Sequence, residues 1–69
     1  MAVEKSIDLS ATGSTIDEAV SQAIHCASLT IQGLTTFEVL NIQGTVQEGG
    51  VAYKVLVRVW FVVKERVHE

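Results

Sequence analysis

Residues 14–24 read Ser-Thr-Ile-Asp-Glu-Ala-Val-Ser-Gln-Ala-Ile, a sequence typical of the start of an amphipathic helix. Either Ser14 with Asp17 or Thr15 with Glu18 has the spacing of a capping box, in which side chains satisfy the first free N–H groups of a helix. Acidic residues in the first turn also complement the helix dipole. The helix is therefore expected to begin at Ser14 or Thr15.

The apolar residues that follow recur at steps of three and four, as they do on one face of a helix. The stripe consists of Ile16, Ala19, Val20, Ala23, Ile24, Ala27, Ile31 and Leu34. This pattern predicts a helix over about residues 15–32, with Gly33 just after its end. The alanines in the stripe leave room for a sheet to approach the helix closely.

Strands are predicted on both sides of this helix. Residues 2–10 place apolar side chains on one face at period two, which predicts a first strand ending at the turn residues 10–14. Two β-rich runs, at about 36–47 and 51–64, are separated by Gly49-Gly50, a hairpin signal that makes them antiparallel neighbours.

The second strand contains a break in its alternation. Phe37 and Val39 share one face, while Leu40 and Ile42 are out of phase with them. This indicates either a β-bulge or a face shared between two cores.

The third strand has two largely apolar faces. One face carries Tyr53, Val55, Val57, Val59, Phe61 and Val63, and the other carries Ala52, Lys54, Leu56, Arg58, Trp60 and Val62. One helix covers only one face of a three-stranded sheet, so the face with Leu56 and Trp60 is expected to need a second subunit.

Length and composition support association of a single α+β domain with βαββ order, spanning residues 1–69. A chain of 69 residues with 48% apolar residues has a small core of its own. Its single cysteine, Cys26, excludes an intrachain disulfide, and no Cys/His pattern has zinc spacing. We therefore expect a homo-oligomer. The charged segment 64–69 is expected to fray.

Several other classes of protein are disfavoured. The net charge of −3 disfavours nucleic-acid binding. The longest apolar run, 51–63, is interrupted by charges and is shorter than the roughly 18 to 20 residues of a membrane-spanning helix. No apolar signal sequence follows Met1, so with the free Cys26 we expect a cytoplasmic protein.

His25 and Cys26 point about 100° apart on a helix, so they do not form a catalytic pair, and we expect no enzyme. We expect no metal site within one chain, although copies of a carboxylate around a symmetry axis could bind a cation.

The order of these segments resembles the dodecin family of small flavin-binding proteins. The resemblance rests on residues 14–24, on Gly33-Leu34, Phe37-Glu38-Val39 and Ile42-Gln43-Gly44, and on Val51-Ala52-Tyr53 and Val59-Trp60-Phe61. It implies a three-stranded antiparallel sheet wrapped around the helix and a hollow homododecamer. It also implies storage or sequestration of flavin, with pairs of flavins stacked between tryptophans at two-fold axes.

The chain departs from the dodecin pattern at the flavin-contacting positions. The family's stacking tryptophan falls at Thr36, its flavin-binding acid at Asn41, and the glutamine after the third-strand tyrosine at Lys54. Trp60 stands where the family commonly has glycine, and it either replaces the missing aromatic surface or fills a subunit contact. These four residues form the predicted ligand site.

Two functions remain open from the sequence. One is a non-enzymatic flavoprotein shell that binds FMN, FAD or riboflavin at this site. The other is a dodecin-like assembly protein that has lost flavin binding and has a structural role or another ligand.

Overall fold

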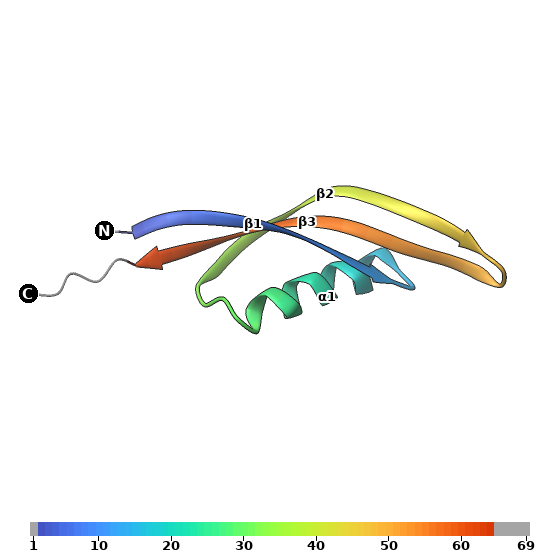
Figure 1. Ribbon diagram of the computed structural model, residues 1–69, viewed down its shortest axis with the longest axis horizontal. Coiled ribbons are helices and arrows are strands. Elements are labelled where there is room, and N and C mark those ends of the chain that lie inside the picture. Colours follow the sequence, from blue (N-terminus) through green and yellow to red (C-terminus); the bar gives the residue numbers. More distant parts are fainter. Residues whose placement is uncertain (1, 65–69) are drawn as a thin grey trace, which may run out of the picture.

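The computed structural model describes residues 2–64 and contains one helix packed on one antiparallel sheet (Figure 1). The elements are β1 (Ala2–Gly13), α1 (Ile16–Ser28), β2 (Leu34–Gln47) and β3 (Gly50–Lys64). The strand order is β1-β3-β2, so β3 is the central strand and pairs with both neighbours. The predicted α+β fold with βαββ order is confirmed. The predicted frayed segment falls almost wholly on residues 65–69, which lie outside the described residues.

Helix α1 begins with the second of the two predicted caps. Thr15 is the N-cap, and its Oγ1 accepts a hydrogen bond of 3.0 Å from the backbone N–H of Glu18. The Glu18 Oε1 in turn accepts from the backbone N–H of Ser14 at 3.2 Å. The first turn is thus stabilised in both directions, as a capping box requires, although the returning bond ends on Ser14.

The helix is shorter than the predicted 15–32, because it ends at Ser28. The N–H groups of Leu29, Thr30 and Ile31 close the last turn on the carbonyls of Cys26 and Ala27. Beyond them Gly33 has a φ of 81° in the connection to β2, not directly after the helix. The extended prediction was wrong because Leu34 matches the helical step but pairs with Phe61 in the sheet.

Strand β1 is longer than the predicted 2–10, since it continues to Gly13, the partner of Tyr53. The expected turn is therefore compressed into Ser14 and Thr15. Gly13 makes this possible because a Cβ there would lie 2.9 Å from the backbone nitrogen of Ala19. Strand β1 thus runs directly into the start of the helix.

The core lies between α1 and the middle of β3. Its fully buried residues are Ala19, Ala23 and Ala27 from the helix and Val55, Val57 and Val59 from the strand. Small side chains on the helix let its backbone come close to the branched side chains of the sheet. At about 1.5 Å per residue the 13-residue helix is about 20 Å long, whereas the strands extend about 40 to 50 Å, so both ends of this face remain uncovered.

Strand β2 contains the predicted bulge and a second irregularity. The pairing with β3 shifts between Val39 and Asn41, where Leu40 is the extra residue, and again between Leu34 and Thr36. The shift at Leu40 returns Ile42 to the helix side of the sheet, opposite Val55. It also turns Asn41 to the other side, because side chains alternate along a strand.

Candidate functional site

The side of the sheet that faces away from α1 carries the predicted site. We call this side the open face. Cross-strand partners project to the same side, so the register groups its residues into rows of three across β1, β3 and β2. The rows are Thr12–Lys54–Gln43, Ser10–Leu56–Asn41, Asp8–Arg58–Glu38 and Ser6–Trp60–Thr36.

All four predicted site residues lie on the open face, but in two groups. Thr36 and Trp60 are direct partners in one row, while Asn41 and Lys54 lie in two neighbouring rows further along β3. Rows are about 6.7 Å apart, so Trp60 and Lys54 are separated by about 20 Å along the strand. The row of Arg58 lies between the two groups.

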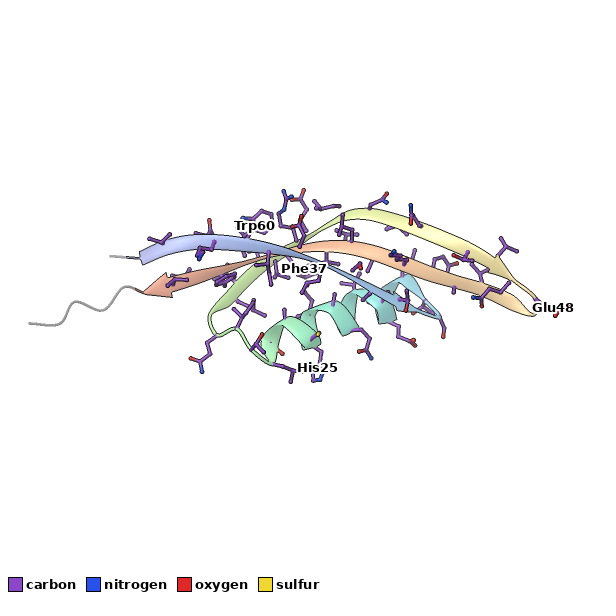
Figure 2. The ribbon with its side chains drawn as sticks, viewed as in Figure 1. His25, Phe37, Glu48 and Trp60 are labelled. Carbon is purple, nitrogen blue, oxygen red and sulfur yellow. The ribbon has the colours of Figure 1, made fainter. Side chains whose placement is uncertain are left out.

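Trp60 is half-buried and offers the one aromatic ring among these rows. Its partner Thr36 is exposed, and the neighbouring Thr35 donates a hydrogen bond from Oγ1 to the Trp60 carbonyl at 3.3 Å. Phe37 pairs with Val59 and therefore projects to the helix side, away from Trp60 (Figure 2). An aromatic surface on the open face must therefore come from Trp60.

Arg58 and Asp8 form a two-pronged ion pair in the row between the two groups. Arg58 Nε donates to Asp8 Oδ1 at 2.8 Å, and Nη2 donates to Oδ2 at 3.1 Å. This hydrogen bonding lowers the pKa of the Asp8 carboxyl and raises the pKa of the Arg58 guanidinium. The adjacent Glu38 also favours the charged guanidinium. The Arg58–Asp8 pair is neutral as a whole, and Glu38 adds one negative charge to the row.

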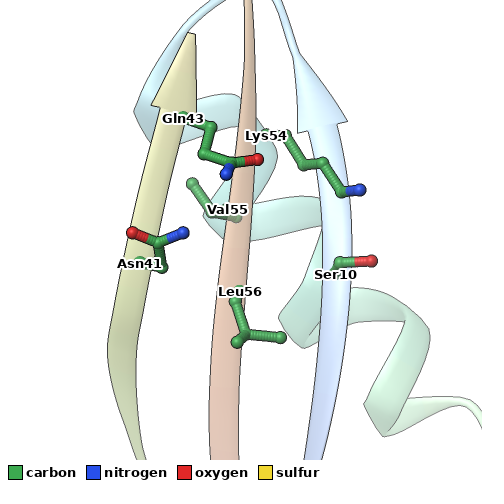
Figure 3. A pocket seen from close by; sticks show the side chains of 6 residues that line it. All are labelled: Ser10, Asn41, Gln43, Lys54, Val55 and Leu56. Atoms are coloured by element: carbon green, nitrogen blue, oxygen red, sulfur yellow. The ribbon is translucent and has the colours of Figure 1, made fainter.

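A shallow hollow of about 260 Å³ lies between the Lys54 and Leu56 rows (Figure 3). Its lining consists of Ser10, Asn41, Gln43, Lys54, Val55 and Leu56. The sequence prediction included Asn41 and Lys54 but missed Ser10 and Gln43. Both residues join the hollow through strand register: Ser10 on β1 is the partner of Leu56, and Gln43 on β2 is the partner of Lys54. The register of β2 also passes two irregularities, which the alternation of residues does not reveal.

Side chains that could bind a metal are dispersed over the fold. Within residues 2–64 no group of three or more His, Cys, Asp or Glu side chains gathers as a candidate metal site. Cys26 is exposed on α1 and is a free thiol. In the described part of the chain, no helix has both the length and the apolar character needed to cross a membrane.

Comparison with known proteins finds related sequences and folds. A family model described as Dodecin matches residues 3–64. No curated protein matches the sequence. The crystal structure of a Thermus thermophilus dodecin mutant has a TM-score of 0.88 and 34% identity, covering 94% of this chain and 100% of that one.

More distant structures share the same architecture. The dodecin from Streptomyces davaonensis has a TM-score of 0.85 and 27% identity, covering 93% of this chain and 97% of that one. A calcium dodecin from Mycobacterium tuberculosis, described with a novel calcium-binding site, has a TM-score of 0.72 and 20% identity over 97% of this chain and 96% of that one. This last likeness concerns the fold alone.

Proposed function

Because the chain belongs to the dodecin family, we propose that it is a non-enzymatic protein that binds and stores a flavin within a homododecameric shell. One observation carries the flavin part of this proposal. Trp60 is the direct cross-strand partner of Thr36, the position at which dodecins carry their stacking tryptophan. The aromatic ring is therefore kept in the same row of the open face, one strand further toward the centre of the sheet.

The geometry of that row makes the exchange physically reasonable. Directly opposed residues have Cβ atoms about 4.5 to 5.5 Å apart, so an indole on β3 lies close to the place that an indole on β2 would take. An aromatic ring stacked on another contributes about 0.5 to 1.5 kcal/mol beyond the area it buries. Trp60 can thus supply to a flavin the stacking that threonine cannot. Thr36 is small, so the space beside the Trp60 indole is not filled by the second tryptophan ring that the dodecin pattern would place there.

The polar groups of the proposed site come from the other end of the open face. Asn41 both donates and accepts hydrogen bonds, and Lys54 brings a positive charge. Asn41 lies in the row of Leu56 and Lys54 in the next, so a bound molecule that starts at Trp60 meets them along β3. The Arg58–Asp8 pair, which lies in between, presents little net charge to a neutral ring.

Exposed apolar side chains support the assembly part of the proposal. Leu56 is 37% exposed on the open face. On the helix side further apolar side chains are exposed at the ends of the sheet and along the edge strand β2. They are Val3, Val46, Val51 and Val63 at the ends, and Phe37 and Ile42 on β2. Contacts between subunits would cover these side chains and add to the small core of each chain. The cytoplasm is the proposed compartment, in keeping with the free thiol of Cys26.

Flavin fluorescence quenching tests the proposal directly. FMN, FAD and riboflavin are titrated with the parent protein, with Trp60→Leu, and with the matched control Phe37→Leu on the other side of the sheet. We expect quenching by the parent and by Phe37→Leu, and at least tenfold weaker binding by Trp60→Leu. Light scattering on each sample verifies that the variants assemble as the parent does.

A different outcome would favour the second candidate function. The substitutions at Thr36, Asn41 and Lys54 are the observation in its favour, because all three family contacts are changed. If an intact homododecamer quenches none of the three flavins, and Thr36→Trp does not restore quenching, the chain is an assembly protein without flavin binding.

A further inference from the structure

The hollow beside Lys54 gathers hydrogen-bond donors from all three strands. Ser10 comes from β1, Lys54 from β3, and Asn41 and Gln43 from β2. In Figure 3 the Lys54 side chain extends over β1 toward Ser10, while the carboxamides of Asn41 and Gln43 turn toward β3. Leu56 provides an apolar wall, so the polar groups converge on a partly sheltered space.

The lining of this hollow is positively charged. It contains the ammonium group of Lys54 and no acidic side chain. Among the described residues Lys54 has no salt-bridge partner, whereas Arg58, the other cation of the four rows, is held by Asp8. Glu38 lies two rows from Lys54, about 13 Å along the sheet. That distance exceeds the screening length of about 10 Å at 0.1 M salt, so Glu38 compensates Lys54 only weakly.

We propose that this hollow is a subsite for an oxyanion, namely a phosphate group carried by the small-molecule ligand. Lys54 supplies the positive charge, the amide groups of Asn41 and Gln43 supply neutral donors, and the Ser10 hydroxyl supplies a further donor. Hydrogen bonds from a cation to a phosphate oxygen are shorter and stronger than neutral ones. The apolar wall formed by Leu56 limits competition from water on one side.

The position of the hollow relative to Trp60 selects the kind of ligand. The identity of the ligand rests on the proposed flavin function, in which the flavin ring lies on the Trp60 row. The Leu56 row, at the near edge of the hollow, is about 13 Å from Trp60 along β3. A ring with an extended chain ending in phosphate, such as FMN with its ribityl chain, reaches this near edge. Lys54 itself lies one row further, about 20 Å from Trp60, but its side chain extends back toward Ser10 in the Leu56 row (Figure 3). Riboflavin has the same ring and chain but ends in a neutral hydroxyl.

Comparing the affinities for FMN and riboflavin isolates the contribution of the phosphate group to binding. Binding of FMN and of riboflavin is measured on the assembled parent protein and on Lys54→Gln, with Lys54→Arg as the charge-retaining variant. Lys5→Gln is the matched control, because it removes the same charge from an exposed lysine whose partner Phe61 lies on the helix side. We expect the parent and Lys5→Gln to bind FMN about tenfold more tightly than riboflavin, with a preference that weakens as NaCl is raised.

Lys54→Gln should abolish this preference by weakening FMN alone, and Lys54→Arg should retain it. Equal affinity of the parent for FMN and riboflavin would overturn the subsite while leaving the flavin function standing. Equal weakening of both flavins by Lys54→Gln would also overturn it, because Lys54 would then contact the ring. If neither flavin binds, the flavin function fails and calorimetry with inorganic pyrophosphate decides the subsite. Saturable binding that is lost in Lys54→Gln would support it, and no binding to the parent would refute it.

Discussion

Replacing Ala23 with leucine should destabilise the protein strongly, because the alanine lies in a closed seam between helix and sheet. Ala23 is 2% exposed and belongs to the cluster that contains Val55, Val57 and Val59, each at most 1% exposed. A leucine at this position must place its isopropyl group where those valines already lie. The helix would have to move away from β3, and the neighbouring Ala19 and Ala27 would lose contact with the sheet.

The sign of the effect follows from comparing two magnitudes. If the seam had free space, the added carbon atoms would stabilise the fold by about 0.8 kcal/mol for each buried methylene. Overpacking of a filled core instead costs about 1 to 3 kcal/mol. Since all six cluster residues are essentially inaccessible to solvent, we expect the cost to exceed the gain. For a domain of this size each kcal/mol lowers the melting temperature by roughly 4 to 8 °C.

Thermal unfolding followed by circular dichroism measures the change. The matched control is Ser21→Leu, which adds leucine to an exposed position of the same helix. All samples are compared at one protein concentration, because the proposed association would make the melting temperature depend on concentration. An Ala23→Leu variant that melts at or above the temperature of the parent would show that the seam between α1 and β3 has room for a larger side chain, and would refute its close packing.

Three further predictions concern a close contact, an ion pair and the proposed assembly. Gly13→Ala should cost about 1 to 3 kcal/mol because its Cβ would meet the backbone of the helix at 2.9 Å. Gly44→Ala, whose nearest contact would be 3.9 Å, should be neutral or stabilising by about 0.4 to 1 kcal/mol in urea unfolding. The pKa of Asp8 is lowered below its ordinary value of 3.8 by Arg58, so the stabilisation is present above about pH 5 and is lost as the pH falls through the folded-state pKa. The urea midpoints of the parent and Asp8→Asn should accordingly differ at pH 7 and approach each other as the pH falls below 3.8. A constant difference over this range would contradict the role of the ion pair. Leu56→Asp should shift the light-scattering mass of the proposed homododecamer toward smaller species, and an unchanged mass would show that this part of the open face lies outside the subunit contacts.

The helix and the hairpin could be predicted from the sequence because their signals are local. Thr15 and Glu18 lie one turn apart, and Gly49 joins two strands that are neighbours in the chain. The end of the helix was harder to predict. Thr30 and Ile31 are β-branched and disfavour helix only weakly. The helical spacing of the apolar residues as far as Leu34 therefore predicted a helix that is longer than the observed one.

The site could be predicted only in part because it depends on strand register. The four expected residues share one face, but alternation explains this only for Lys54 and Trp60 on β3. Thr36 and Asn41 are an odd number of residues apart on β2 and share the face because Leu40 is an extra residue between them. Their division into two groups, and the contributions of Ser10 and Gln43, depend on how β1 and β2 align with β3. No local pattern fixes that alignment when Thr35 and Leu40 each add an unpaired residue to β2.

The extra residue at Leu40 decides which side of the sheet each residue in the outer half of β2 faces. Every residue from Asn41 to the hairpin owes its inward or outward direction to a single inserted position, while the pairing with β3 continues past it. Deleting that one position would exchange the two sides of this half-strand, placing Ile42 and Val46 on the side where Asn41 and Gln43 now project. An insertion or deletion of one residue at this point would therefore turn the candidate site residues of β2 to the opposite side of the sheet. Relatives that differ in length here must be aligned so that residues on the same side of the strand correspond before their site residues are compared.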